Sequence, residues 1–129
     1  MPLVRITQHN VRTATQTTQL TDIVQDVMLE LFDAPPGDRY QIVETLPAGS
    51  IIAEDTGLGI ERSDGVVIIQ ITQQGRDAQQ KQRIYAALAE RLAAADLVRP
   101  QDLIISVVEN RLEDWSFGMG RAQFLTGEL

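Results

Sequence analysis

Two strand–helix–strand patterns follow one another along this chain, and they restrict its possible folds more than any other feature. In the first pattern, apolar and polar residues alternate at 2–8 and predict a strand, and apolar residues at helical spacing follow it. This helical stripe consists of Leu20, Ile23, Val24, Val27, Met28 and Leu31. Pro35 and Pro36 are expected to end the helix, and Tyr40 to Thr45 predicts the second strand.

The second half of the chain repeats the order of the first. The β-branched run from Val66 to Thr72 predicts a buried strand, and Leu103 to Val108 predicts the last main strand. Between them, one face of a second helix is marked by Ile84, Leu88 and Leu92. The tail from Asp114 to Gly120 is expected to be a loop, followed by a short strand at Gln123–Thr126.

Both expected helices carry a capping signal at their start. Thr13 with Gln16 forms a capping-box pattern before the first helix, and Asp77 with Gln80 does so before the second. A connection that contains a whole helix joins parallel strands, and its right-handed crossover places both helices on one side of the sheet. We therefore expect an α/β (α+β) fold in which a four-stranded, mainly parallel sheet carries two helices on one face, as a single domain of residues 1–129.

The composition limits what such a domain can bind. Of the 129 residues 43% are hydrophobic and 22% are charged, as in ordinary globular proteins, and the net charge of −7 argues against binding nucleic acid or an anionic membrane. The absence of cysteine excludes disulfides, thiol nucleophiles and thiolate metal sites. No apolar run predicts a membrane span or a signal peptide, so we expect a cytoplasmic protein. The open face of so apolar a sheet is expected to pack against other subunits.

Few residues in the sequence are candidates for catalysis, metal binding or phosphate binding. His9 is the sole histidine and is expected in a polar turn, poorly placed for a catalytic triad, and no cluster has metal-ligand spacing. The glycine pairs at 57–59 and 118–120 lack the context of a phosphate-binding loop and are interpreted as turns.

Pro2 is the most informative candidate. Removal of Met1 exposes it as a secondary amine, and an α-amino group has a pKa of about 7.7–8.0. A neighbouring cation or burial lowers that pKa toward a general base, whereas a carboxylate keeps the amine protonated as an acid. The alternative is that Pro2 has no role, since proline is well tolerated at the first residue of a strand.

The other candidate site residues can also be interpreted without a function. Asp38 and Tyr40 lie in the turn before the second expected strand, where they are either functional or solvated. Arg76 lies just before the second helix and suits carboxylate binding through its two-pronged guanidinium, unless it is a surface charge. Trp115 and Phe117 are either pocket walls or core residues.

Three separated motifs resemble the tautomerase superfamily. They are Met-Pro at the start of a strand, Pro-Pro-x-Asp-Arg-Tyr-Gln at 35–41, and Asp-Trp-Ser-Phe-Gly at 114–118. Within that superfamily the chain is most similar to the malonate semialdehyde decarboxylase branch. The resemblance implies a β-α-β unit repeated twice, a homotrimer, no cofactor, and catalysis by the N-terminal proline on a small oxo acid.

The same resemblance implies roles for individual residues. Pro2 matches the catalytic proline, which polarises the substrate carbonyl or forms an iminium with it. Asp38 matches an aspartate that positions water or keeps the proline protonated, Arg76 matches a carboxylate-binding arginine, and Tyr40 is expected to contact the substrate. The hydrophobic wall maps onto Trp115, Phe117, Phe124 and Leu129.

One position departs from the branch. The decarboxylase pattern has two arginines separated by one residue, and here the first of these is Gln74 while only Arg76 matches. Glutamine can donate a hydrogen bond to the substrate but brings no charge, which weakens carboxylate binding and leaves the substrate open. The alternatives are a keto–enol tautomerase with neutral Pro2 as base, a hydratase of unsaturated acids acting through Asp38, and a trimeric binding protein without chemistry.

Overall fold

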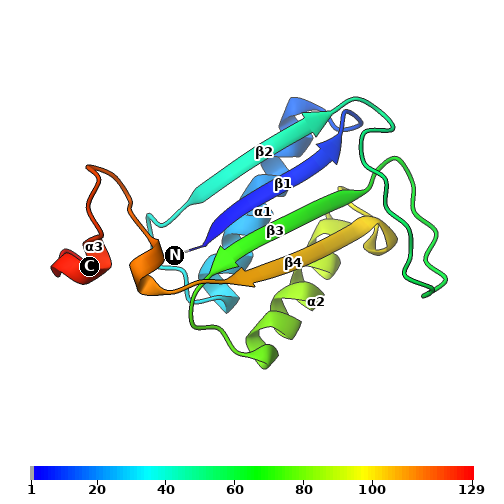
Figure 1. The fold of residues 1–129 in the computed structure, drawn as a ribbon. Helices are drawn as coiled ribbons and strands as arrows, with labels where there is room; N and C mark the ends of the chain where they lie inside the picture. Colours follow the sequence, from blue (N-terminus) through cyan, green and yellow to red (C-terminus); the bar gives the residue numbers. More distant parts are fainter. Residues whose placement is uncertain (1) are drawn as a thin grey trace.

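The computed structural model of the chain describes residues 2–129 (Figure 1). Met1, whose removal the sequence analysis expects, lies outside the described residues. No helix within the described part of the chain is long and apolar enough to cross a membrane.

A single four-stranded sheet organises these residues, with the strands in the order β2-β1-β3-β4. The strands are β1 (Leu3–His9), β2 (Tyr40–Leu46), β3 (Val67–Gln73) and β4 (Leu103–Glu109). β1 pairs with β2 and β3 pairs with β4 in parallel, whereas the two central strands β1 and β3 are antiparallel. The sheet is therefore mixed, and the mainly parallel β-α-β arrangement expected from the sequence is confirmed.

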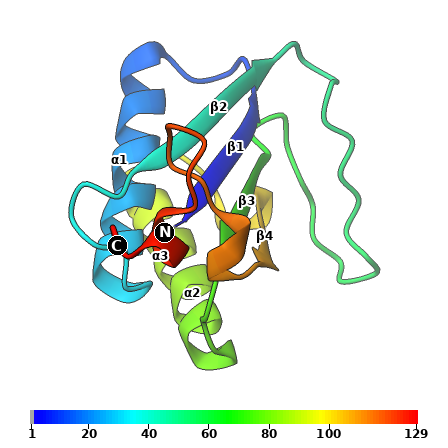
Figure 2. The same ribbon diagram turned by 60° about the vertical axis from the view of Figure 1, so that its left-hand side comes forward.

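Two long helices cover one face of the sheet, as Figure 1 and Figure 2 show. They are α1 (Ala14–Leu31) and α2 (Ala78–Ala94), and each begins with the capping box that the sequence predicts. α1 ends before the two prolines. The Phe32 and Ala34 N–H groups both donate to the Met28 carbonyl oxygen, and Asp33 between them lies in the left-handed region at φ 54°.

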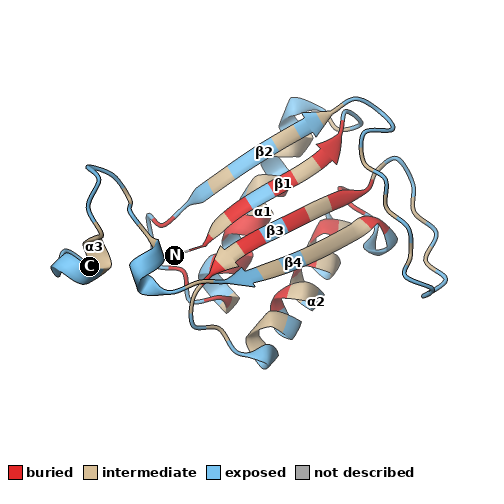
Figure 3. Ribbon diagram, viewed as in Figure 1, coloured by how far each residue is buried: buried red, intermediate tan, exposed pale blue. Residues whose placement is uncertain are grey.

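The core lies between the helices and the central strands, where Figure 3 shows the buried positions. The inward residues of β1 and β3 meet the predicted helical stripes, and the fully buried members include Val4, Ile6, Leu20, Val24, Val27, Met28, Phe32, Ile69, Ile71, Ile84, Leu88 and Leu92. The opposite face of the sheet is open and carries both apolar and charged side chains. On it Ile42 and Val108 are exposed, and Arg5 pairs with Glu44.

The pairing of β1 with β3 determines what lies beside the chain's N-terminal end. Leu3 at the start of β1 pairs with Tyr40 at the start of β2 on one side and with Thr72 near the end of β3 on the other. The turn before β2 and the loop after β3 therefore meet at this edge of the sheet. The C-terminal segment reaches the same edge, as Figure 2 shows.

Two sequence expectations are wrong. Gln123–Thr126 forms a short helix, α3, instead of a strand. Its backbone bonds are local, since the Leu125 and Thr126 N–H groups both donate to the Ala122 carbonyl oxygen, and Gly127 ends the turn in the left-handed conformation at φ 82°. His9 is the buried last residue of β1 and not part of a polar turn. Its Nε2 accepts the Ile51 N–H at 2.9 Å and its Nδ1 lies 2.9 Å from the Asp64 carbonyl oxygen, so the ring fixes the loop after β2 in place.

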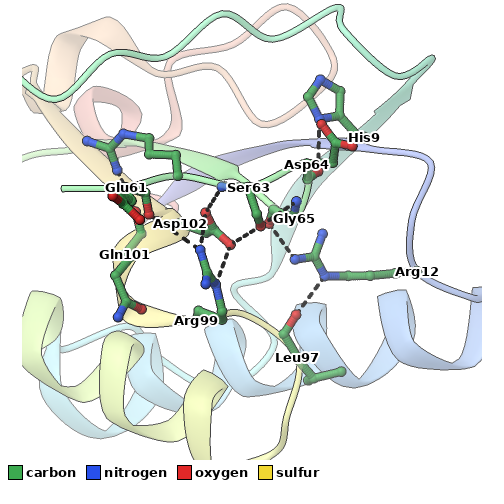
Figure 4. Close-up of polar contacts among 11 residues, drawn as sticks. His9, Arg12, Glu61, Ser63, Asp64, Gly65, Leu97, Arg99, Gln101 and Asp102 are labelled. Atoms are coloured by element: carbon green, nitrogen blue, oxygen red, sulfur yellow. Dashed lines mark hydrogen bonds and ion pairs between the residues drawn. The ribbon is translucent and has the colours of Figure 1, made fainter.

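A polar network around the buried Asp102 carboxylate holds the edge of the sheet opposite the N-terminal end (Figure 4). The Asp102 carboxylate accepts hydrogen bonds from the Ser63 backbone N–H at 2.7 Å, from the Ser63 hydroxyl at 2.6 Å and from Arg99 at 3.1 Å. Arg12 donates to the carbonyl oxygens of Leu97 and Gly65. Burial alone raises the pKa of Asp102, but the bonds from Arg99 and Ser63 outweigh it and hold the pKa below its ordinary value.

We expect Asp102→Asn to lower the free energy of unfolding at pH 7 by about 2–3 kcal/mol, because it removes charge-assisted bonds from a buried site. Because folding lowers the pKa of Asp102, its contribution is complete above the unfolded value of about 3.9 and is lost as pH falls through the lower folded-state pKa. Urea denaturation from pH 7 to pH 2.5 measures both effects. Asp96→Asn, at an exposed carboxylate of the same region, is the control. An equal loss in both variants would contradict this role.

Candidate active site

Pro2 is buried immediately before β1 and lies between two different groups of side chains. The register of β1 with β2 places the turn that contains Asp38 on one side of it. The register of β1 with β3 places Gln73 on the other side. The candidate site therefore has a β2 side and a β3 side, and Pro2 stands between them.

Asp38 is positioned by a tight turn on the β2 side. The Asp38 N–H donates to the Pro35 carbonyl oxygen at 3.1 Å, and Pro36 and Gly37 occupy the two central positions. Gly37 has φ 82°, which a type II turn requires at its second central residue, and proline suits the first. The turn buries Asp38 to 6% relative exposure, and this burial raises the pKa of its carboxyl.

An aromatic cluster covers the β2 side. Phe117 lies 5.5 Å from Tyr40, 5.3 Å from Trp115 in a stacked pair, and 5.6 Å from Phe124 in an edge-to-face pair, measured between ring centroids. Asn110 accepts the indole N–H of Trp115 at 3.1 Å. The C-terminal residues of the chain thus pack against the chain's own Asp38 turn and form a largely apolar wall there.

A cleft of about 430 Å³ lies between that turn and the C-terminal segment. Of the residues expected at the site, Asp38, Tyr40, Phe117 and Leu129 line it, while Trp115 and Phe124 support Phe117 from behind. Its lining also includes Gln123 and Glu128, which the sequence analysis did not single out. Gln123 holds the C-terminal loop through bonds to the Phe117 N–H at 2.9 Å and the Gly118 carbonyl at 2.8 Å. No sequence motif marks either residue.

Arg76 lies on the β3 side and binds the end of α1. Its Nε donates to the Phe32 carbonyl at 2.7 Å, its Nη1 to the Gln74 carbonyl at 2.8 Å and its Nη2 to the Asp33 carbonyl at 3.4 Å. The last carbonyl groups of a helix lack intrahelical hydrogen-bond donors and carry a partial negative charge. A guanidinium there supplies the missing donors and a compensating positive charge. One N–H on each Nη has no bond to the described residues, and these two are available to a carboxylate.

The β3 side also holds buried amide groups. The side-chain Oε1 of Gln74 is buried and has no hydrogen-bond partner among residues 2–129, and neither carboxamide atom of Gln73 has one. Gln74 was expected at the site from the sequence, whereas Gln73 was not, because the predicted strand ended one residue before it, at Thr72. Within the described chain, no group of three or more His, Cys, Asp or Glu side chains could hold a metal ion.

Arg39 is not part of this site. It donates to Asp22 at 2.8 Å and to Gln41 at 3.0 Å on the protein surface. Of the motif at 35–41, the structure therefore brings Asp38 and Tyr40 to the cleft and leaves the guanidinium outside it.

Comparisons with known proteins show which family the chain belongs to. A family model described as "Tautomerase enzyme" matches residues 38–118. Two proteins of Bacillus subtilis (strain 168) match nearly the whole chain: probable tautomerase YrdN is 45% identical over 129 residues, which is 100% of both chains. Probable tautomerase YusQ is 31% identical over 126 residues, which is 97% of this chain and 99% of the relative.

Solved structures give the same result. Crystal structures of malonate semialdehyde decarboxylase, described as a basis for its decarboxylase and hydratase activities, match with TM-score 0.93 and 39% identity over 98% of each chain. FG41 malonate semialdehyde decarboxylase inhibited by 3-bromopropiolate matches with TM-score 0.94 and 44% identity over 98% of this chain and 97% of the other. A fused 4-OT that forms a symmetric trimer matches with TM-score 0.78 over 97% and 98%, and its 17% identity shows the fold alone.

The contacts of Arg76 predict that its removal destabilises the fold as well as any activity. We expect Arg76→Ala to lower the free energy of unfolding by about 1–3 kcal/mol, because the end of α1 loses its donors. Urea denaturation measures this loss. The control is Arg83→Ala, at an exposed position of α2, which should change stability by less than about 0.5 kcal/mol. Equal stability of the two variants would show that the bonds from Arg76 to α1 contribute nothing.

Proposed function

The chain belongs to the tautomerase family, and on that premise we propose that it is a cofactor-independent enzyme whose N-terminal Pro2 acts on small oxo acids. The activity that we place first is decarboxylation of malonate semialdehyde. One observation carries the proposal: a buried proline begins a central strand, with a buried carboxyl on one side and buried amides and a guanidinium on the other. The sequence identity of 39–44% to two malonate semialdehyde decarboxylases supports the choice of reaction.

In the proposed reaction each side of the site has a separate task. The two remaining N–H groups of Arg76 hold the substrate carboxylate, assisted by Gln74. Protonated Pro2 donates to the aldehyde oxygen. In the alternative, the neutral Pro2 amine condenses with the aldehyde to form an iminium, with loss of water. Either route makes the former aldehyde carbon an electron sink. Asp38 keeps the amine protonated or orients a water. The apolar wall that includes Trp115 disfavours the carboxylate relative to neutral CO₂.

The bond changes follow from these roles. The bond between the methylene carbon and the carboxylate carbon breaks, and its electron pair forms the double bond of an enol as CO₂ leaves. In the acid mechanism the proton of Pro2 goes to the aldehyde oxygen. The enol then takes up a proton at carbon and returns its O–H proton to Pro2, which gives acetaldehyde and restores the cationic amine.

Other reactions at the same site remain as alternatives. A keto–enol tautomerase fits the names of the Bacillus relatives and requires neutral Pro2 as the base. A hydratase fits a buried Asp38 with a raised pKa, because a carboxyl in that state can take a proton from water and return it. A binding protein without chemistry is the alternative outside enzymes.

We also propose that the chain assembles as a homotrimer. On the open face of the sheet the apolar side chains of Ile42 and Val108 are 40% and 55% exposed. A second copy of the chain could cover them. A trimer is the assembly of the fused 4-OT that shares the fold. Expected partners are thus further copies of this chain and a small oxo acid.

The first test is the intact mass of the cell-expressed protein, followed by an assay of malonate semialdehyde. We expect a mass without Met1 and release of acetaldehyde and CO₂, and we expect Pro2→Ala to lower kcat/KM at least about 10³-fold because the electron sink is lost. Arg39→Ala, at a surface residue of the same edge, is the control and should retain activity.

Two results would contradict the proposal. One is a mass that retains Met1 together with full activity, because the Pro2 nitrogen would then be an amide. The other is Pro2→Ala with unchanged decarboxylation. Phenylpyruvate assayed in parallel tests the tautomerase alternative.

A further inference from the structure

Gln73 stands out among the buried polar side chains of residues 2–129. Its relative exposure is 1%, yet neither Nε2 nor Oε1 has a hydrogen-bond partner among residues 2–129. Native proteins satisfy nearly all buried polar groups, because an unpaired amide removed from water is unfavourable. An exception of this kind therefore requires an explanation, and the location of Gln73 provides one.

The register of the central strands places Gln73 beside Pro2. β1 and β3 are antiparallel with Leu3 opposite Thr72 and Val4 opposite Ile71. Continuing this register by one residue beyond the start of β1 places Pro2 opposite Gln73. Val4 and Ile71 both face the helices and are buried. Because side chains alternate along a strand, Pro2 and Gln73 lie on that same face. Directly opposed residues have Cβ atoms about 4.5–5.5 Å apart, which is within reach of a glutamine side chain.

The polar residues next to Gln73 in the described chain form no hydrogen bond with its side chain. The nearest cation along the chain, Arg76, directs its bonds to the carbonyl oxygens of Phe32, Asp33 and Gln74. The adjacent Gln74 itself has an unpartnered buried Oε1. Unused hydrogen-bonding capacity is therefore concentrated at the end of β3, next to the amine that the proposed function requires.

Gln8 provides an internal comparison. It is also fully buried on the helix-facing side of β1, but at the other end of the strand. Its Nε2 donates to Thr17 and Thr45 at 3.1 Å each, and its Oε1 accepts from Arg12 at 3.2 Å. The same residue type on the same face of the sheet is thus fully bonded at one end and unbonded at the Pro2 end.

We propose that Gln73 is a substrate-binding residue whose Nε2 donates a hydrogen bond to the carbonyl oxygen of the oxo acid held at Pro2. The inference rests on the proposed function, in which Pro2 polarises that carbonyl. Negative charge develops on this oxygen as CO₂ leaves, so a fixed N–H there stabilises the transition state more than the bound substrate. Oε1 accepts the second N–H of protonated Pro2 and orients the amine.

The test replaces the amide by apolar side chains of similar size. We expect Gln73→Met and Gln73→Leu to lower kcat for malonate semialdehyde about 100-fold and to weaken binding of malonate, a non-reactive probe, about tenfold. The same variants should melt about 3–8 °C higher than the wild type at equal protein concentration, because they remove an unsatisfied buried group. Malonate binding is read from the fluorescence of Trp115, the one tryptophan of the chain.

Gln8→Met is the matched control, with the opposite expected pattern. It removes bonds that the protein makes, so its melting temperature should fall while kcat and malonate affinity stay within about twofold of the wild type. The proposal is overturned if Gln73→Met and Gln73→Leu retain both kcat and malonate affinity. It is also overturned if they melt lower, as Gln8→Met does, with unchanged malonate affinity. If the wild type does not decarboxylate the substrate, the proposed reaction is wrong, and the malonate affinities alone decide the role of Gln73.

Discussion

The antiparallel pairing of β1 with β3 at the centre of the sheet is the constraint on which the rest of the structure depends. Each half of the chain builds a parallel β-α-β unit by itself, and only this pairing joins the two units into one sheet with a shared core. Because the strands run in opposite directions, the start of one unit meets the end of a strand from the other. Pro2 is thereby placed beside Gln73, which lies 71 positions further along the chain.

The two edges of the sheet differ in how fully their polar groups are bonded. At the edge far from Pro2, Gln8, His9 and Asp102 have their polar atoms bonded by the protein, and the lowered pKa of Asp102 shows that the fold favours its charge. At the Pro2 edge, Gln73 has no hydrogen-bond partner within the described part of the chain, and burial raises the pKa of Asp38. Proteins commonly give up stability where they bind or react, and this contrast agrees with a functional site at the Pro2 edge.

The sequence predicted the elements better than the site. Both capping boxes, the stripe around Val24 and the β-branched run of β3 are local patterns, and each appears in the structure as expected. The segment Gln123–Thr126 was assigned wrongly because four residues of mixed character do not distinguish a helical turn from a strand. Whether such a segment pairs depends on a neighbouring strand edge, which local sequence does not encode.

The candidate site was predicted only in part, because local motifs mark some of its residues while others depend on contacts between distant segments. Asp38, Tyr40 and Phe117 lie together as the motifs indicated, since each motif fixes a turn or a loop. Gln73 was missed because its importance depends on the register with β1, and His9 was misplaced because its two partners come from residues 51 and 64. A sequence pattern can identify a polar residue, but its unmet or satisfied hydrogen bonds become visible only once distant segments are placed.

The proposed acid mechanism requires Pro2 to be a free amine that is protonated at neutral pH. The direct measurement is a titration of the Pro2 nitrogen by NMR in protein labelled with ¹⁵N-proline. We expect a single titrating proline signal with a pKa at or above the ordinary range of about 7.7–8.0, because the Asp38 carboxyl favours the cation. A pKa below about 6.5 would contradict it and indicate a neutral base, and the absence of any titrating proline nitrogen would show that Pro2 is not a free amine.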